Sequence, residues 1–184
     1  MGYSAKVLAS VKSVERDNWN ALTNENPFMS HGFFENLENS KSLEPQGWYS
    51  NHIAVSDQKE VVGILPLFLR DNSYGEFVFD WAWADAFQRA GGKYYPKIQV
   101  AVPFTPVPGK RLLANTDNQE KAFPILLEGI KSFAAKNNLS SAHITFCSFD
   151  EFKKGGSLGL LKRTSSQYHW KNDGYKNFQN FLDA

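Results

Sequence analysis

Residues 73–113 decide how this chain folds, and they read SYGEFVFDWAWADAFQRAGGKYYPKIQVAVPFTPVPGKRLL. Eight of the 22 positions from Tyr74 to Tyr95 are aromatic. Aromatic side chains each bury a large area, so this density exceeds what a core of this size needs. Two aspartates, Asp80 and Asp85, lie among them. A charge placed among bulky apolar groups must be paired, capped or used chemically, so a functional site is expected in this stretch.

Two interpretations of this stretch stay open. Strict alternation of four aromatic residues would give a strand one continuous aromatic face, made by Phe77, Phe79, Trp81 and Trp83. A helix is also predicted over 82–90, with Asp80 as its cap and Asp85 on its solvent side. In the functional alternative, Asp80 or Asp85 binds an amine inside an amphipathic pocket. The aromatic residues that would line that pocket are Tyr74, Tyr94 and Tyr95, whose hydroxyl groups would orient a substrate.

Composition narrows the class of protein. The 184 residues suit one domain, and 20 basic and 19 acidic side chains nearly cancel, which argues against a DNA-binding surface. No segment has the length and hydropathy of a membrane span or a signal peptide, so a cytoplasmic protein is expected. Cys147 is the single cysteine, which excludes an internal disulfide and a cysteine metal cluster. We interpret it as a structural thiol, and no metal site is predicted.

Periodicity predicts a mixed α/β (α+β) domain. Strands are expected over 6–14, 94–104, 140–148 and 161–170, and a hairpin turns at 57–59, with a bulge or an unpaired edge at Pro66 in its second strand. Helices are expected over 14–23, over 31–40 with Ser30 as cap, and over 117–137 with Asp117 and Glu120 as a capping-box-like pair. A last helix starts near Tyr175.

Four segments resemble the Fem-type proteins of bacteria, a largely uncharacterised group within the GNAT acyltransferase superfamily. They are NPFMSHGFFENLENS, the 73–113 stretch, AHITF and QYHWKNDGY. The resemblance implies a GNAT-like fold, with a central mixed, mostly antiparallel twisted sheet flanked by helices. Such proteins look about twice this length, so residues 1–172 would form the first GNAT-like domain. Residues 173–184 would begin the connection to a second half.

The resemblance also implies an acyl- or aminoacyltransferase acting on a cell-wall precursor or another amine acceptor. The implied partners are an acyl donor, either aminoacyl-tRNA or acyl-CoA, an amine acceptor, and the second half or an oligomer partner. Two alternatives stay open. One is a non-catalytic binding or interaction module on a GNAT scaffold, and the other is an ordinary acetyl-CoA-dependent N-acetyltransferase.

Acetyl-CoA is disfavoured by the loop before the long helix. GNAT domains bind the coenzyme A pyrophosphate on backbone N–H groups of a glycine-rich loop at a helix N-terminus. The corresponding residues 104–113, FTPVPGKRLL, contain one glycine, and Pro106 and Pro108 have no N–H group. Thr105, Lys110 and Arg111 could instead contact a phosphate of a larger substrate through their side chains. The alternative is that Lys110 and Arg111 are solvated charges after a turn.

Strand parity gives a second candidate cluster. If 140–148 and 161–170 are neighbouring strands, one face carries His143, Thr145, Gln167 and His169. A histidine there could act as general base on an attacking amine, although polar residues in covered sheets can also be purely structural. We therefore take Asp80 and His169 as candidate catalytic residues. The candidate substrate-binding residues are Tyr74, Trp83, Asp85, Tyr94, Tyr95, Thr105, Lys110, Arg111, His143 and Gln167.

Overall fold

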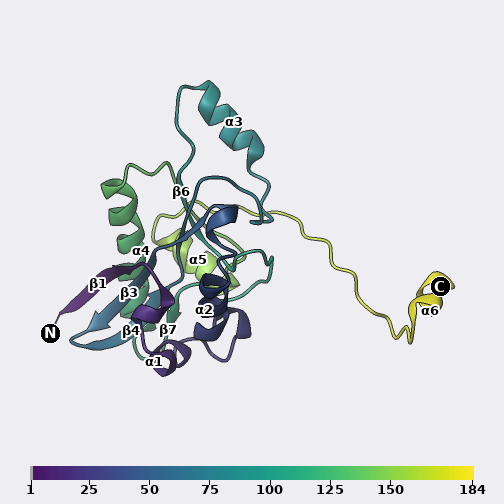
Figure 1. Cartoon of the computed structure of the whole chain (residues 1–184), viewed down its shortest axis with the longest axis horizontal. Coiled ribbons are helices and arrows are strands. Elements are labelled where there is room, and N and C mark those ends of the chain that lie inside the picture. Colours follow the sequence, from purple (N-terminus) through teal and green to yellow (C-terminus); the bar gives the residue numbers. More distant parts are fainter. Residues whose placement is uncertain (1) are drawn as a thin grey trace.

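Two four-stranded sheets form the centre of the protein in a computed structural model that describes residues 2–184 (Figure 1). The first sheet has the order β1-β3-β4-β7, and the second has the order β2-β5-β6-β8. All neighbouring strands are antiparallel except β6 and β8, which are parallel. The expected mixed, mostly antiparallel architecture is confirmed, with its strands divided between two sheets. The strands are β1 Tyr3–Leu8, β2 Trp48–Ser50, β3 His52–Asp57, β4 Glu60–Leu65, β5 Phe68–Arg70, β6 Lys97–Val100, β7 Leu113–Ala114 and β8 Ala142–Ile144.

The division between the sheets falls at Pro66, where the sequence predicted a bulge or an unpaired edge within one strand. Pro66 and Leu67 separate β4 from β5, and Asn51 separates β2 from β3. Proline has no N–H group for the ladder, so the strand pair cannot continue regularly through this point. Both segments pass from one sheet to the other at this point. A backbone hydrogen bond from Asn51 N to Leu67 O, 2.9 Å long, joins them there.

The long helix α4, Gln119–Lys136, packs on β3 and β4 of the first sheet. Gly63 permits this close approach, because a Cβ at that position would lie 2.9 Å from the Cβ of Ala122. The helix buries five apolar residues, including Leu126 and Ile130, against both sheets. The prediction that Asp117 and Glu120 form a capping pair is wrong. Asn118 is the N-cap residue, and the Glu120 carboxylate pairs with Lys154 at 2.6 Å instead.

A second core lies beneath the N-terminal helices. Ser30 caps α2, His31–Asn39, as predicted, by accepting a hydrogen bond from Phe33 N at 3.2 Å. Phe34 packs in this core with Trp19, Trp48 and Phe68. The first strand starts earlier and the first helix is shorter than expected. The short elements here are η1 Val11–Ser13, α1 Arg16–Asn20, η2 Pro27–Met29 and η3 Glu44–Gln46.

The aromatic stretch forms a loop and then a helix that projects from the body (Figure 1). Helix α3, Trp81–Arg89, confirms the predicted helix. The alternative of a strand with one aromatic face is wrong, because Phe77 adopts a positive φ of 56° and the helix begins at Trp81. The four alternating aromatic residues are consequently exposed rather than packed in one row.

The chain beyond β8 forms one further helix against the body and then runs outward. Helix α5, Phe149–Ser157, has a capping box made by Ser148 and Glu151. We call residues 161–184 the arm, because they lead away from the body to α6, Phe178–Leu182 (Figure 1). The strand expected over 161–170 is wrong. Every residue of it is exposed, and none pairs with a strand of the described chain.

Candidate functional site

One face of the second sheet carries buried polar side chains. Trp48 of β2 lies opposite Arg70 of β5, which in turn lies opposite Lys97 of β6. Gln99 of β6 lies opposite His143 of β8. Directly opposed residues point to the same side of a sheet, as do residues two apart along a strand. We call this side of the sheet the polar face after its polar residues Arg70, Lys97, Gln99, His143 and Thr145, and the aromatic residues Trp48 and Phe68 lie on the same side.

Lys97 is the centre of this face and is fully buried. Its ammonium group donates to Ser73 Oγ at 2.9 Å, Glu76 Oε2 at 2.7 Å and Asp80 Oδ2 at 2.5 Å. An ammonium group has three donors, so all of them are used. Lys97 therefore has no N–H group left for a further acceptor.

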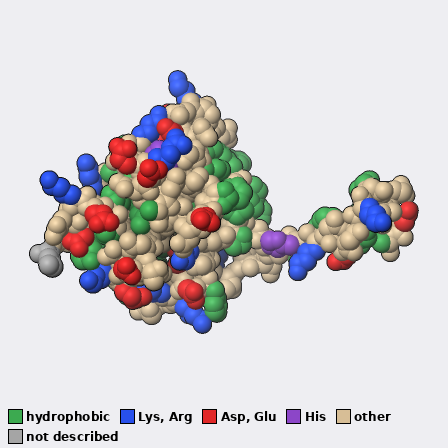
Figure 2. Space-filling model, turned by 90° about the horizontal axis from the view of Figure 1, so that it is seen from below, with side chains coloured by type: hydrophobic (Ala, Val, Ile, Leu, Met, Phe, Trp, Pro, Cys, Tyr) green, Lys and Arg blue, Asp and Glu red, His purple; other side chains and the backbone are tan. Residues whose placement is uncertain are grey.

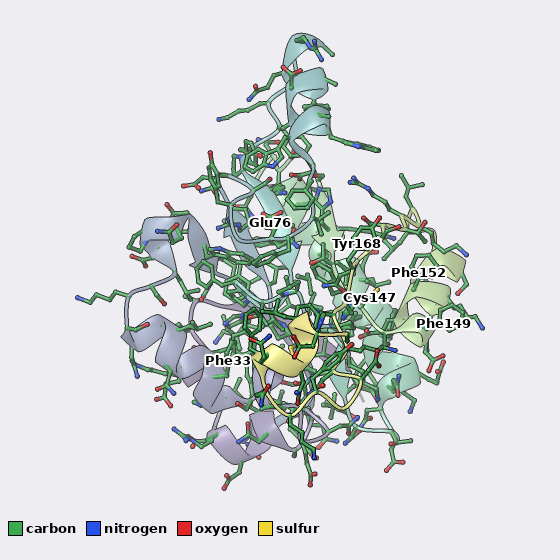
Figure 3. All side chains as sticks on the ribbon, turned by 90° about the vertical axis from the view of Figure 1, so that its right-hand side faces the viewer. Phe33, Glu76, Cys147, Phe149, Phe152 and Tyr168 are labelled. Atoms are coloured by element: carbon green, nitrogen blue, oxygen red, sulfur yellow. The ribbon has the colours of Figure 1, made fainter. Side chains whose placement is uncertain are left out.

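Arg70 fixes the loop that supplies the carboxylates. Its Nε donates to Glu76 Oε1 at 3.0 Å, and its remaining nitrogens donate to Gln46 O, Asn72 Oδ1 and Tyr74 O. The guanidinium group also stacks on the ring of Trp48, 3.9 Å from the ring centroid. Glu76 thus bridges Arg70 and Lys97 at the base of the projecting helix (Figure 3).

Asp80 does not cap α3, which corrects one of the two sequence interpretations. The residue occupies the N-cap position, but its side chain makes no cap hydrogen bond. Instead, Oδ2 accepts from Lys97 and from Tyr94 Oη at 2.8 Å. Burial would raise the pKa of Asp80, but the hydrogen bonds from Lys97 and Tyr94 and the charge of Lys97 outweigh it and lower the pKa. The other oxygen, Oδ1, is buried and has no hydrogen-bond partner.

The neighbours of Asp80 include two tyrosines and a histidine. Burial and the Asp80 carboxylate raise the pKa of Tyr94, and burial raises the pKa of Tyr95, whose hydroxyl shares a 2.8 Å hydrogen bond with Ser73. Burial, followed by the charge of Lys97, lowers the pKa of His143 to about 4. His143 is therefore neutral at neutral pH, with Nε2 2.9 Å from Ser141 Oγ.

Two further buried atoms in this region lack a partner. Gln99 Nε2 donates to Thr145 Oγ1 at 2.8 Å, but Gln99 Oε1 accepts nothing. Trp48 Nε1 is a buried donor without an acceptor. Buried polar groups are normally satisfied. Asp80 Oδ1, Gln99 Oε1 and Trp48 Nε1 are three of the six unpartnered buried atoms among the described residues, and the others are His31 Nδ1, Asp57 Oδ1 and Lys154 Nζ.

Three predicted substrate residues lie outside this face, on or beside α3. Tyr74 is 65% exposed and packs on Trp81, with ring centroids 4.9 Å apart. Trp83 is 61% exposed, and Asp85 forms an exposed 2.6 Å ion pair with Arg89. The structure therefore brings Tyr94, Tyr95 and Asp80 together and separates them from these three.

The predicted cluster of His143, Thr145, Gln167 and His169 does not form. His143 and Thr145 belong to the polar face, but Gln167 and His169 lie on the exposed arm. Gln167 Nε2 donates to Pro106 O at 3.2 Å, and the His169 ring lies 3.0 Å from the Gln167 side chain. The pairing failed because residues 161–170 form no strand. The neighbour of β8 is β6, which brings Lys97 and Gln99 to this face.

The loop 104–113 is held together by Arg111. This residue is fully buried, and its guanidinium group donates to the carbonyl oxygens of Thr145, Gly109, Lys110 and Val107. Arg111 is thus not a solvated charge, and its donors are occupied by the chain itself. Lys110 is exposed, and Thr105 Oγ1 donates to Pro103 O at 3.2 Å. Cys147 pairs with Gly109 in an isolated parallel bridge, and burial raises the pKa of its thiol.

The N-terminus of α4 does not fit the pyrophosphate of coenzyme A. The helix follows Asn115, Thr116, Asp117 and Asn118, without a glycine. Asp117 and Glu120 lie beside the N–H groups that an anion would need, and like charges repel. In the loop before β7, Gly109 N already donates to Phe146 O at 2.9 Å. Among the described residues, no group of three or more His, Cys, Asp and Glu side chains could hold a metal ion.

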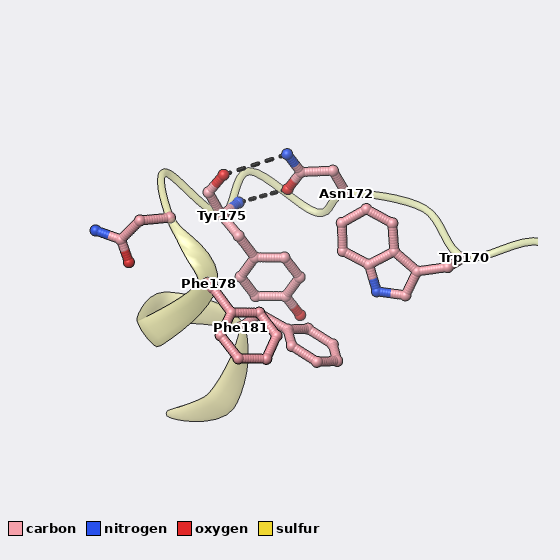
Figure 4. A pocket seen from close by; sticks show the side chains of 6 residues that line it. Trp170, Asn172, Tyr175, Phe178 and Phe181 are labelled. Carbon is pink, nitrogen blue, oxygen red and sulfur yellow. Dashed lines mark hydrogen bonds between the residues drawn. The ribbon is translucent and has the colours of Figure 1, made fainter.

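Two surface hollows lie away from the polar face. One, of about 430 Å³, lies within the arm among aromatic side chains such as Trp170 and Phe181 (Figure 4). The other, of about 460 Å³, lies on α3 among Ala82, Trp83 and Phe87. Figure 2 shows hydrophobic side chains gathered on one flank of the body, with charged groups mostly elsewhere on that view.

The sequence patterns did not identify the charged and polar residues that organise the site. These are Arg70, Ser73, Glu76, Lys97 and Gln99. The pattern KIQV carried a usable signal, because Lys97 and Gln99 alternate with Ile98 and Val100. Such a strand has one apolar face and one polar face. Near the carboxylates Glu76 and Asp80, the polar face indicates a buried ion cluster.

Three solved structures illustrate the similarity of the fold. A ribosomal-protein-alanine N-acetyltransferase from Brucella melitensis is 11% identical, with a TM-score of 0.55 over 92% of this chain and 99% of that one. The aminoglycoside 6'-N-acetyltransferase of Acinetobacter haemolyticus is 11% identical, with a TM-score of 0.50 over 92% and 98%. The glucosamine-6-phosphate N-acetyltransferase of Arabidopsis thaliana is 6% identical, with a TM-score of 0.51 over 92% and 99%. These likenesses show a GNAT fold.

No curated protein matches the sequence. No helix of the described residues is long and apolar enough to cross a membrane. The sequence profile of the FemAB-like family, described as peptidoglycan biosynthesis/recognition, matches residues 10–184. This match covers nearly the whole chain and agrees with the fold. The chain is therefore a GNAT-fold protein that belongs to the FemAB-like family.

Proposed function

We propose that this protein transfers an acyl or aminoacyl group to an amine acceptor, and that the amine reacts at the polar face. The observation that carries the proposal is Asp80, which is 1% exposed and whose Oδ1 has no partner. A buried carboxylate oxygen without a donor is costly. An N–H group of a bound amine would satisfy it, next to a His143 ring that carries no charge at neutral pH.

The similar structures support the type of reaction. The names of all three describe acetyl transfer to nitrogen, on a protein alanine, an aminoglycoside and an amino sugar phosphate. The family description adds peptidoglycan biosynthesis or recognition. We therefore propose that the acceptor amine belongs to a cell-wall precursor.

In the proposed reaction, the lone pair of the amine nitrogen forms the new bond to the carbonyl carbon of the donor. The carbon–heteroatom bond of the donor then breaks, and the leaving group takes its electron pair. As the nitrogen becomes positive, Asp80 Oδ1 accepts its proton and passes it to the leaving group. Lys97 and Tyr94 keep Asp80 ionised by donating to Oδ2, which leaves Oδ1 free for the amine.

The donor is proposed to be larger than acetyl-CoA, such as an aminoacyl-tRNA. The acidic, glycine-free start of α4 disfavours the coenzyme A pyrophosphate, and Arg111 is already occupied. Lys110 is the exposed basic side chain of the loop 104–113 and could contact a phosphate of such a donor.

A second candidate function is a non-catalytic binding module on the same fold. It is supported by the position of the two hollows, which lie on α3 and the arm rather than at the polar face. In that case, the ion cluster would serve to hold the loop 71–80 in place, and the exposed aromatic residues would contact the ligand.

Radiolabel transfer tests the proposal. The protein is incubated with aminoacyl-tRNA or acetyl-CoA and with a primary-amine peptide from a cell-wall precursor. We expect label to move from aminoacyl-tRNA to the amine, and Asp80→Asn to lower the rate by about 100-fold or more. Asp85→Asn is the matched control, because it changes an exposed carboxylate of the same segment, and it should retain the wild-type rate.

Absence of transfer from either donor would exclude the enzymatic proposal and favour the binding module. Equal rates for the two aspartate variants would keep the activity but remove Asp80 from it. Thermal unfolding of both variants establishes whether a lost rate reflects a lost fold.

A further inference from the structure

Gln99 of β6 is a second buried acceptor on the polar face, separate from Asp80. Its side chain is fully buried, yet Oε1 has no hydrogen-bond partner. Lys97 binds Asp80, and Gln99 follows it two positions later on the same strand. The backbone of Gln99 therefore lies about 7 Å further along the face. The proposed reaction uses Asp80 Oδ1 and leaves Gln99 Oε1 without a role.

The Gln99 amide is held in one orientation by Thr145. Its Nε2 donates to Thr145 Oγ1 at 2.8 Å. The backbone of Thr145 is itself fixed, because its N–H donates to Val100 O at 3.1 Å and its carbonyl oxygen accepts from Arg111 Nε at 3.0 Å. Since one end of the planar amide is bound, the direction of Oε1 is set before a ligand arrives. A preorganised acceptor of this kind loses little entropy when it binds a donor.

A structural role alone explains the Gln99 side chain poorly. A buried amide oxygen without a donor destabilises a fold, because the oxygen loses its hydrogen bonds to water and gains none. An apolar side chain of similar length would fill the same space without that cost. Ile98 and Val100 do so on the other face of β6. A donor supplied by a ligand would remove the cost at Gln99.

The two free acceptors differ in charge, and this difference indicates the chemistry of the ligand. Asp80 is ionised and suits a basic amine, whereas the carboxamide of Gln99 is neutral and suits a neutral N–H group. We propose that Gln99 Oε1 accepts a backbone N–H of the acceptor, so that the site selects an amine carried on a peptide over a free amine. This role of Gln99 rests on the proposed function, because it places the amine at Asp80. A ligand reaches the face beside His143 and Tyr95, which are half-buried.

A backbone ester scan tests this role by calorimetric titration of the full chain. The probes are a primary-amine peptide and analogues in which one backbone N–H at a time is replaced by an ester oxygen. We expect one replacement to weaken binding to the wild type about tenfold, since it leaves Gln99 Oε1 unpaired again. Gln99→Met has a side chain of similar length without the amide oxygen. In this variant, the same replacement should change the Kd by about twofold at most.

Two further variants control for position and for folding. Gln88→Met makes the same change at an exposed position of α3, and it should keep the wild-type response to the scan. Gln99→Met combined with Thr145→Val removes both partners of the internal hydrogen bond, so no polar group is left unpaired there. This double variant should unfold cooperatively on heating and should respond to the scan as Gln99→Met does.

The outcomes separate the role of Gln99 from the proposed function. If Asp80→Asn weakens binding but Gln99→Met responds to the scan as the wild type does, the role of Gln99 is overturned and the proposed function stands. The role is also overturned if no ester analogue binds the wild type more weakly, or if a free alkyl amine binds as tightly as the peptide. If the peptide does not bind the wild type, or binds Asp80→Asn equally well, both proposals for the polar face fail.

Discussion

The two faces of the second sheet are built from the same strands, but only one of them carries buried charged residues. On one face, Ile98, Val100 and Leu69 pack into an apolar cluster with α4. On the other face, Arg70 and Lys97 are fully buried and meet two carboxylates. The apolar face is stabilised by burial alone. The polar face has to offset the desolvation of four charged groups with specific hydrogen bonds.

The comparison shows where this chain departs from what a fold requires. Buried ion clusters rarely stabilise a protein more than apolar residues of similar size would. A charged face that is costly to maintain, and that leaves Asp80 Oδ1 and Gln99 Oε1 without donors, supports the proposal that this face has a chemical task. The difference between the faces can be tested by substituting neighbouring residues of β6.

Replacing Lys97 should have the largest effect. Lys97→Met leaves Glu76 and Asp80 buried near each other without the cation between them, which should cost about 3–5 kcal/mol of stability. Ile98→Val, one position along on the apolar face, should cost about 0.5–1.5 kcal/mol. Chemical denaturation of both variants measures the difference. Similar losses for the two variants would mean that the polar face is no more demanding than the apolar one.

His143 should make the polar face sensitive to acid. Its folded pKa of about 4 lies below the ordinary value of about 6.5, so the unfolded chain binds this proton first. Stability should therefore fall as the pH drops from about 6.5 towards 4, and the effect of this group is absent above that window. Denaturation of the wild type and His143→Gln between pH 7 and 4 isolates it. The variant should show the shallower dependence, and parallel curves would contradict the assignment.

Tyr94 should contribute least. Tyr94→Phe removes one donor to Asp80 Oδ2, but Lys97 still donates to the same oxygen. We expect a loss of about 1 kcal/mol in thermal or chemical unfolding. A loss as large as that of Lys97→Met would indicate that Tyr94, and not Lys97, holds the carboxylate in place.

Local signals in the sequence predicted much of the fold. The Ser30 cap, the hairpin at 57–59 and the interruption at Pro66 depend on neighbouring residues, and all three are confirmed. The long helix and α3 were found from periodicity. The strand expected over 161–170 failed because a strand needs a partner, and a sequence pattern does not specify one.

The site was predicted only in part. Asp80 was singled out, but its carboxylate was assigned to a cap or an amine rather than to Lys97, 17 positions later. Arg111 was assigned to a phosphate contact or to a solvated charge, although it donates to carbonyl groups of the loop 104–113 and of Thr145, just after β8. Both errors concern contacts between segments distant in sequence, which depend on sheet order and not on local pattern.

The most direct test is to follow the His143 imidazole nitrogens by NMR while titrating the protein with a primary-amine peptide. If Asp80 Oδ1 receives the amine beside His143, the signal should shift saturably in the wild type and in Asp85→Asn. The shift should be lost in Asp80→Asn. An equal shift in all three proteins, or none in the wild type, would contradict the claim that the polar face binds the reacting amine.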